Sequence, residues 1–114
     1  MMTTSRLTES RRYKRVPLGA RLECRSQEGT TVGWAENVCV AGMLVRAAST
    51  FAPDAVISVS FPLPDSDVPI RCQARVAHVV PGAFMGIEFL DLSPADRQRI
   101  EEFAAATAAA KQQT

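Results

Sequence analysis

Residues 68–89, VPIRCQARVAHVVPGAFMGIEF, contain two apolar segments joined by Pro81-Gly82. The first segment alternates side chains in the pattern of an extended strand, which puts one set on each face: Ile70, Cys72, Ala74 and Val76 on one, and Arg71, Gln73 and Arg75 on the other. Proline followed by glycine favours a turn. We therefore predict an antiparallel hairpin whose strands cover residues 68–80 and 84–89.

The same alternation predicts four earlier strands, at residues 16–24, 30–36, 43–45 and 55–61. The turn residues Ser26 to Gly29 join the first two strands, and a proline-rich loop at residues 62–67 precedes the hairpin. Residues 37–42 are expected to connect the second strand to the third.

One helix is expected, after the last strand. Ser93 is a good N-cap, Pro94 suits the first helical position, and Asp96 completes a pattern similar to a capping box. Ile100, Phe103 and Ala104 form one apolar stripe, whereas residues 104–110 favour a helix but offer little to pack. Six short strands and a late helix predict a mainly β fold: a six-stranded antiparallel β-barrel with one C-terminal α-helix.

The expected organisation is one domain with two short flanking segments. Residues 1–10 are polar and without periodicity and are expected to form a flexible arm. Residues 11–104 form the barrel domain with its helix, and residues 105–114 form an alanine-rich helix end and tail. A chain of 114 residues fits this single domain.

Charge and hydropathy exclude several classes of protein. A net charge of +1 argues against coating nucleic acid polymers. No apolar run approaches the roughly 20 residues that span a bilayer, and the polar start lacks a signal-peptide hydrophobic region. We therefore expect a cytoplasmic protein with no membrane insertion.

No catalytic or metal-binding motif is present. The three cysteines, Cys24, Cys39 and Cys72, are widely spaced and form no pair typical of a zinc site. The single histidine, His78, has no nucleophile or carboxylate at a recognisable motif spacing and is interpreted as structural or exposed. The sequence favours a binding module over an enzyme, with no metal and no cofactor.

The first candidate binding element is the basic cluster Arg11-Arg12-Tyr13-Lys14-Arg15 before the first strand. Residues 1–16 carry five basic residues and one acid, whereas the rest of the chain carries 8 basic and 11 acidic residues. Arginines four apart in a flexible segment can enclose a small anion, and their planar forks suit phosphates. The alternative is a solvated basic tail.

The second candidate element is Asn37-x-Cys39-x-x-Gly42, between two strands. An ordinary turn initiated by asparagine and completed by glycine explains these residues. The alternative is a polar shelf for the edge of a base, built from an amide, a thiol and an accessible backbone, although such an element by itself is more often just a turn.

Together the two elements resemble the PilZ family of cyclic di-GMP receptors. That family carries R-x-x-x-R before its first strand and [D/N]-x-S-x-x-G about twenty residues later. Arg11-x-x-x-Arg15 matches the first motif, with Arg12 as the common second arginine, and Asn37, Cys39 and Gly42 align with the second. Residues 86–93, GIEFLDLS, followed by a charged helix, also look like the end of the family's barrel.

The resemblance implies a PilZ-like split barrel that binds cyclic di-GMP, its ligand, and signals through an unidentified protein partner. Arg11, Arg12 and Arg15 would grip phosphates and guanine, Asn37 would contact guanine, and Gly42 would let the backbone approach the ligand. Cys39 stands where the family has serine, and a thiol is the weaker donor.

That departure keeps an alternative open: an adaptor of the same fold that acts through protein contacts without the nucleotide. A third reading, a barrel that binds RNA or single-stranded DNA, would need exposed aromatic side chains for stacking.

Overall fold

The computed structural model describes residues 15–64 and 66–113 of the chain. The expected arm at residues 1–10, Arg11 and Arg12 lie outside the described residues. The six expected strands and the helix are all present, in this order: β1 (Val16–Ser26), β2 (Gly29–Val38), β3 (Gly42–Arg46), β4 (Val56–Phe61), β5 (Ile70–Val80), β6 (Phe84–Phe89) and α2 (Pro94–Gln113).

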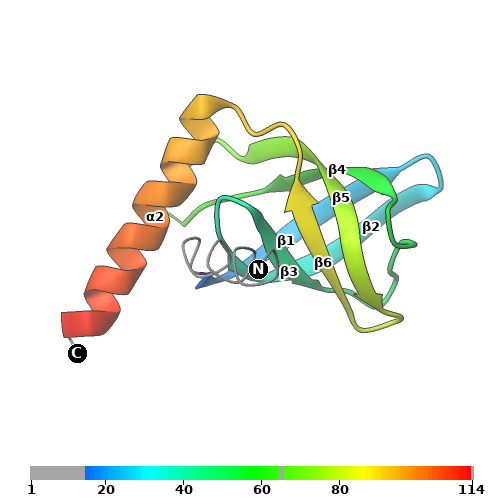
Figure 1. Ribbon diagram of the computed structural model, residues 1–114, viewed down its shortest axis with the longest axis horizontal. Coiled ribbons are helices and arrows are strands. Elements are labelled where there is room, and N and C mark those ends of the chain that lie inside the picture. Colours follow the sequence, from blue (N-terminus) through cyan, green and yellow to red (C-terminus); the bar gives the residue numbers. More distant parts are fainter. Residues whose placement is uncertain (1–14, 65, 114) are drawn as a thin grey trace, which may run out of the picture.

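The strands close into an antiparallel barrel in the order β1-β2-β3-β6-β5-β4 (Figure 1). The predicted six-stranded antiparallel barrel with one C-terminal helix is therefore confirmed. The seam that closes it is short, because β1 pairs with β4 only through Glu23 to Arg25, opposite Ser60 to Ser58. The first half of β1 is therefore hydrogen-bonded to β2 on one side and to no strand on the other. Pro17 can lie there because the N–H that proline lacks is not required for a hydrogen bond to a second strand.

Alternation along the strands fills the interior with apolar side chains. On β5 the predicted inward set includes Ile70, Ala74 and Val76, all fully buried. Phe61, the largest fully buried side chain, stacks on Phe89 with the ring centroids 5.9 Å apart. Among the described residues no polar or charged residue is buried. Burial of this apolar set is the main force that holds the barrel together.

The apolar side chains of β2 do not all join the core. Val32 and Trp34 are 48% and 41% exposed, whereas Ala35 and Val38 are fully buried. Ala35 and Val38 therefore face the interior of the barrel, whereas Val32 and Trp34 lie on its outside.

The connection between β2 and β3 is tighter than the sequence indicates. Asn37 belongs to β2 and Gly42 begins β3, instead of both lying in a connecting loop. The backbone N–H of Cys39 donates to the carbonyl of Gly42 at 2.9 Å, which closes a short turn over residues 39–42.

Helix α2 begins as predicted and runs beside the barrel (Figure 1). The backbone N–H of Asp96 donates to Ser93 Oγ at 3.0 Å, the expected N-cap. Ile100 is fully buried in the core, and Phe103 and Ala104 pack against it. The helix continues to Gln113, through the residues expected to form its end and tail. Within the described chain, no helix combines the length and apolar character that crossing a membrane requires.

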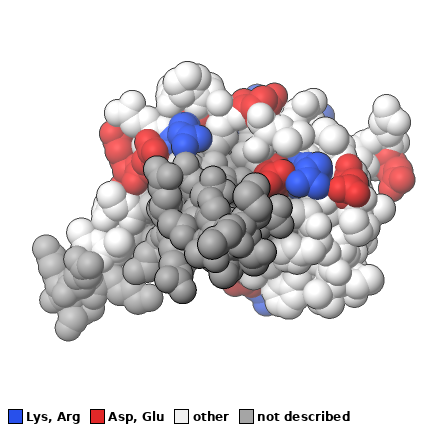
Figure 2. Space-filling view, in the orientation of Figure 1, with Lys and Arg blue, Asp and Glu red and all other residues white. Residues whose placement is uncertain are grey.

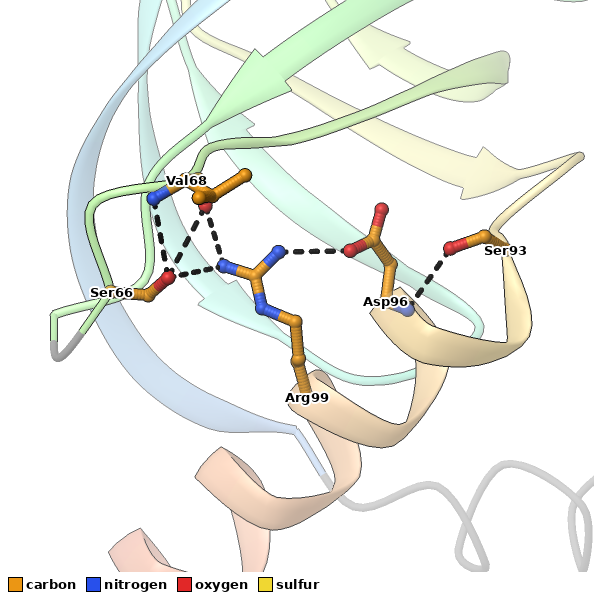
Figure 3. Close-up of polar contacts among 5 residues, drawn as sticks. All are labelled: Ser66, Val68, Ser93, Asp96 and Arg99. Carbon is orange, nitrogen blue, oxygen red and sulfur yellow. Dashed lines mark hydrogen bonds and ion pairs between the residues drawn. The ribbon is translucent and has the colours of Figure 1, made fainter.

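Arg99 joins the helix to the loop between β4 and β5 (Figure 3). Its guanidinium donates to Asp96 Oδ1 at 2.8 Å, to Ser66 Oγ at 2.8 Å and to the carbonyl of Val68 at 2.5 Å. The Arg99 and Asp96 side chains are only 24% and 20% exposed, so solvent screens their ion pair less than a surface pair.

We predict that Arg99→Met lowers the free energy of unfolding by about 2 kcal/mol, because it keeps the aliphatic stem and removes the charged hydrogen bonds. Urea denaturation followed by circular dichroism would measure the change. Arg71→Met is the control: Arg71 is exposed on β5 and forms no ion pair with a described residue, so its loss should cost less than about 0.5 kcal/mol. Equal effects of the two substitutions would contradict the role assigned to Arg99.

Candidate functional site

Between the same two pairs of aligned positions, the neighbouring strands β1, β2 and β3 contain different numbers of residues. Two residues separate Pro17 from Ala20 on β1, one residue separates Ala35 from Asn37 on β2, and none separates their partners on β3. These irregularities are β-bulges, which bend strands and redirect side chains. Glu36 is the extra residue on β2, so both Glu36 and Asn37 lie partly exposed between the inward-facing Ala35 and Val38.

An open depression of ≈ 570 Å³ lies on the outer wall at this place. Strands β1, β2, β3 and β6 and the residue that precedes β1 supply its lining: Arg15, Pro17, Glu36, Asn37, Leu44, Arg46 and Phe84. The bulges thus produce a concave surface with polar side chains on a barrel whose outer wall would otherwise be convex.

Arg15 and Asn37, two of the predicted site residues, meet in this depression. Arg15 is exposed at the start of β1, and Asn37 is half-buried on the neighbouring strand. The side-chain oxygen of Asn37, Oδ1, is buried and has no hydrogen-bond partner among the described residues. Because buried acceptors are nearly always hydrogen-bonded, this oxygen marks a position where a donor is expected.

An ion pair forms one rim of the depression. Arg46 Nε lies 2.7 Å from Glu36 Oε2, and the two side chains are 57% and 33% exposed. Arg46, Leu44 and Phe84 were not predicted from the sequence, because they join the site only through the pairing of β2 with β3 and of β3 with β6. The one available signal was the alternation of Leu44 and Arg46 on the outward face of their strand.

Cys39 and Gly42 are beside the depression but do not line it. The Cys39 side chain is only 4% exposed, and its backbone closes the turn to Gly42. A Cβ on Gly42 would collide with the carbonyl oxygen of Ile87 on β6, so the close packing of β3 on β6 requires glycine here. Arg11 and Arg12 lie outside the described residues.

The remaining thiols and the histidine have structural environments. Burial raises the pKa of Cys24 to about 11, and burial together with Asp91 and Asp96 raises that of Cys72 to about 12, so both thiols stay protonated and poorly nucleophilic at neutral pH. The ring of His78 lies over Gly86, where a Cβ would collide with it. Within the described ranges, no group of three His, Cys, Asp or Glu side chains has an arrangement suited to a metal ion.

Charges on the face shown in Figure 2 are mixed: basic and acidic side chains lie next to one another on a largely uncharged surface. Among the described residues, Arg75 pairs with Glu88 at 2.7 Å and with Asp54 at 2.9 Å. The described residues on this face therefore do not form the uniform positive surface that is typical of proteins that bind nucleic acid polymers.

A closed barrel with a flanking helix and a polar depression on its wall defines a small β-barrel domain. The chain belongs to the PilZ domain family, whose match covers residues 9–106. No curated protein matches the sequence.

Solved structures share the fold at low sequence identity. The inhibitor of motility MotI/DgrA of Bacillus subtilis has a TM-score of 0.78 and 17% identity, covering 87% of this chain and 51% of that one. YcgR of Escherichia coli in complex with c-di-GMP has a TM-score of 0.76 and 10% identity, covering 90% and 47%. The MrkH–c-di-GMP complex of K. pneumonia has a TM-score of 0.69 and 18% identity, covering 91% and 55%. This chain thus spans about half the length of each.

Proposed function

We propose that this protein is a cyclic di-GMP receptor that binds the nucleotide on the outer wall of its barrel and signals through a protein partner, without catalysis. Membership of the PilZ family supports the ligand class. The titles of two structures with this fold state that YcgR and MrkH bind c-di-GMP.

The observation that carries the proposal is the buried, unpartnered Oδ1 of Asn37 in the same depression as Arg15. A guanine edge presents N–H donors, which this oxygen can accept, while the Arg15 guanidinium can donate to a phosphate. One concave surface thus carries both a donor for a phosphate, on Arg15, and an acceptor for a base edge, on Asn37. Pro17 and Leu44, which also line it, offer apolar contact to a planar ring.

In this proposal Arg11 and Arg12 join Arg15 in gripping the nucleotide, so that binding brings the arginine-rich segment against the barrel. Cys39 and Gly42 act indirectly. They shape the turn that follows Asn37, because the Cys39 N–H holds the carbonyl of Gly42. The surface that changes on binding is what a partner would recognise.

Calorimetric titration of the folded protein with cyclic di-GMP tests the proposal. A saturable heat that is absent with GMP at the same concentration supports it. No heat at high micromolar cyclic di-GMP, with circular dichroism showing a folded barrel, would reject it.

A second candidate function is an adaptor of the same fold that does not bind the nucleotide. The environment of Cys39 favours it, because the thiol stands where the family has serine and its side chain is almost fully buried outside the lining of the depression. A small apolar side chain at this place serves the packing of the turn as well as a hydroxyl would.

Cys39→Ser separates the two candidates. If the protein is a receptor, the Cys39→Ser variant should bind cyclic di-GMP about as tightly as the wild type, because residue 39 lies outside the lining of the depression and acts only through the turn. An adaptor should give no heat with either protein. Ala41→Ser, which adds a hydroxyl at the exposed neighbouring position, is the control and should leave the titration unchanged.

A further inference from the structure

Glu36 and Asn37 are consecutive residues of β2, yet both contribute to the outer wall of the barrel. In a regular strand neighbouring side chains point to opposite faces, so one of the two would face the core. The bulge interrupts this alternation: Ala35 and Val38 are fully buried, whereas the two residues between them are partly exposed. Both line the depression of the proposed nucleotide site. Adjacent residues thereby bring a carboxylate and an amide to one concave surface.

An arginine on the neighbouring strand holds the carboxylate. Arg46 Nε on β3 lies 2.7 Å from Glu36 Oε2. The other carboxylate oxygen, Oε1, forms no hydrogen bond or ion pair with a described residue, and neither does Asn37 Oδ1. The lining therefore offers two acceptors without a donor among the described residues. The ion pair also offsets the charge of the carboxylate, and with Arg15 the lining keeps a net positive charge that suits a phosphate.

The Watson–Crick edge of guanine matches two neighbouring acceptors. Guanine presents two adjacent donors on this edge, the N1–H and the N2 amino group. Adenine presents one amino donor beside N1, which carries a lone pair and no proton. Because an ionised carboxylate only accepts hydrogen bonds, it attracts the guanine donors and repels the lone pair of adenine N1. Acceptors in this position therefore favour guanine over adenine.

We propose that Glu36 is a specificity-determining residue that selects guanine over adenine in the bound nucleotide. Asn37 alone selects less well, because an amide has a donor and an acceptor and can turn to suit either base. Arg46 is the positioning residue, since its ion pair limits the rotation of the Glu36 side chain. The inference rests on the proposed function, because it assigns the base recognition of that same site.

Isothermal titration calorimetry of the wild type and of Glu36→Gln, each with cyclic di-GMP and with cyclic di-AMP, tests the proposal. Glutamine is close to glutamate in size but carries an N–H donor, which can bind adenine N1. We expect the preference for cyclic di-GMP over cyclic di-AMP to fall about tenfold or more, because a hydrogen bond to a charged group is replaced. Cyclic di-AMP should bind about two- to fivefold more tightly than to the wild type, a gain that misfolding cannot imitate.

The ratio of the two affinities separates base recognition from charge. Removing the carboxylate also lessens its repulsion of the phosphates, but this effect is the same for both nucleotides and cancels in the ratio. Arg46→Met should lower the ratio by a smaller factor, about threefold, because the carboxylate stays but rotates more freely. Glu23→Gln is the control: it removes an exposed carboxylate of β1 outside the lining and should leave the ratio unchanged.

The outcomes distinguish this inference from the proposed function. If the wild type binds cyclic di-GMP and Glu36→Gln has the same ratio of affinities, the role of Glu36 is overturned and the receptor remains. A wild type that binds cyclic di-AMP as tightly as cyclic di-GMP would overturn it in the same way. A folded wild type that gives no heat with either nucleotide would overturn the receptor and this inference together.

Discussion

Arg15→Ala is expected to weaken cyclic di-GMP binding by between about tenfold and about 150-fold. The guanidinium at the start of β1 shares a depression with the unpartnered amide oxygen of Asn37, where no carboxylate neutralises it within 4.0 Å among the described residues. A charge-assisted hydrogen bond to phosphate contributes about 1.5–3 kcal/mol, and each 1.4 kcal/mol changes affinity tenfold. Isothermal titration calorimetry of both proteins measures the loss.

Two further variants separate geometry from charge. Arg15→Lys keeps the charge but not the planar fork, so its affinity should fall between those of the wild type and Arg15→Ala. Arg71→Ala removes a basic residue from β5, outside the lining of the depression, and should leave affinity unchanged. If wild type and Arg15→Ala bind equally, the depression at residues 15–46 is not where the nucleotide binds.

Gly42→Ala is expected to lower the free energy of unfolding by about 3 kcal/mol. The added Cβ would collide with the carbonyl oxygen of Ile87 and lie 3.2 Å from the Cα of Glu88, both backbone atoms of the paired strand β6. A side chain could rotate away, but a backbone can yield only by opening the ladder, so the cost is at the upper end of that for overpacking. The midpoint of urea denaturation measures it.

The stability of Gly42→Ala shows whether packing on β6 is the reason why the family motif has glycine at this position. Ala41→Ser, at the exposed neighbouring position, should change stability by less than about 0.5 kcal/mol. If Gly42→Ala keeps wild-type stability and loses only nucleotide affinity, then close approach of the ligand, and not packing on β6, is the reason for glycine.

Local patterns were enough to predict the strands and the helix. Alternation along β5 gave the inward set of Ile70 to Val76, and Ser93 with Asp96 gave the start of the helix, because each signal is contained in one segment of chain. Residues 37–42 were assigned to a connection because a single segment does not reveal how tightly the next strand follows.

The candidate site was predicted in part. Arg15 and Asn37 were found from their spacing, and the structure brings them together. Arg46 was not predicted, since its place beside Glu36 and Phe84 depends on how β3 pairs with β2 and with β6. Cys39 was recognised as unusual from its residue type, but its burial followed only from the packing of the turn.

The bulges on β1 and β2 make the shape of the depression sensitive to the insertion or deletion of single residues. Over the same stretch β1 has two residues, β2 has one and β3 has none between paired positions. In genetic terms, the depression depends on the number of codons in each strand as well as on their identity. An in-frame deletion of codon 18 or codon 36 would leave every lining residue except Glu36 encoded in the gene, yet would change the curvature that brings Arg15 and Asn37 together.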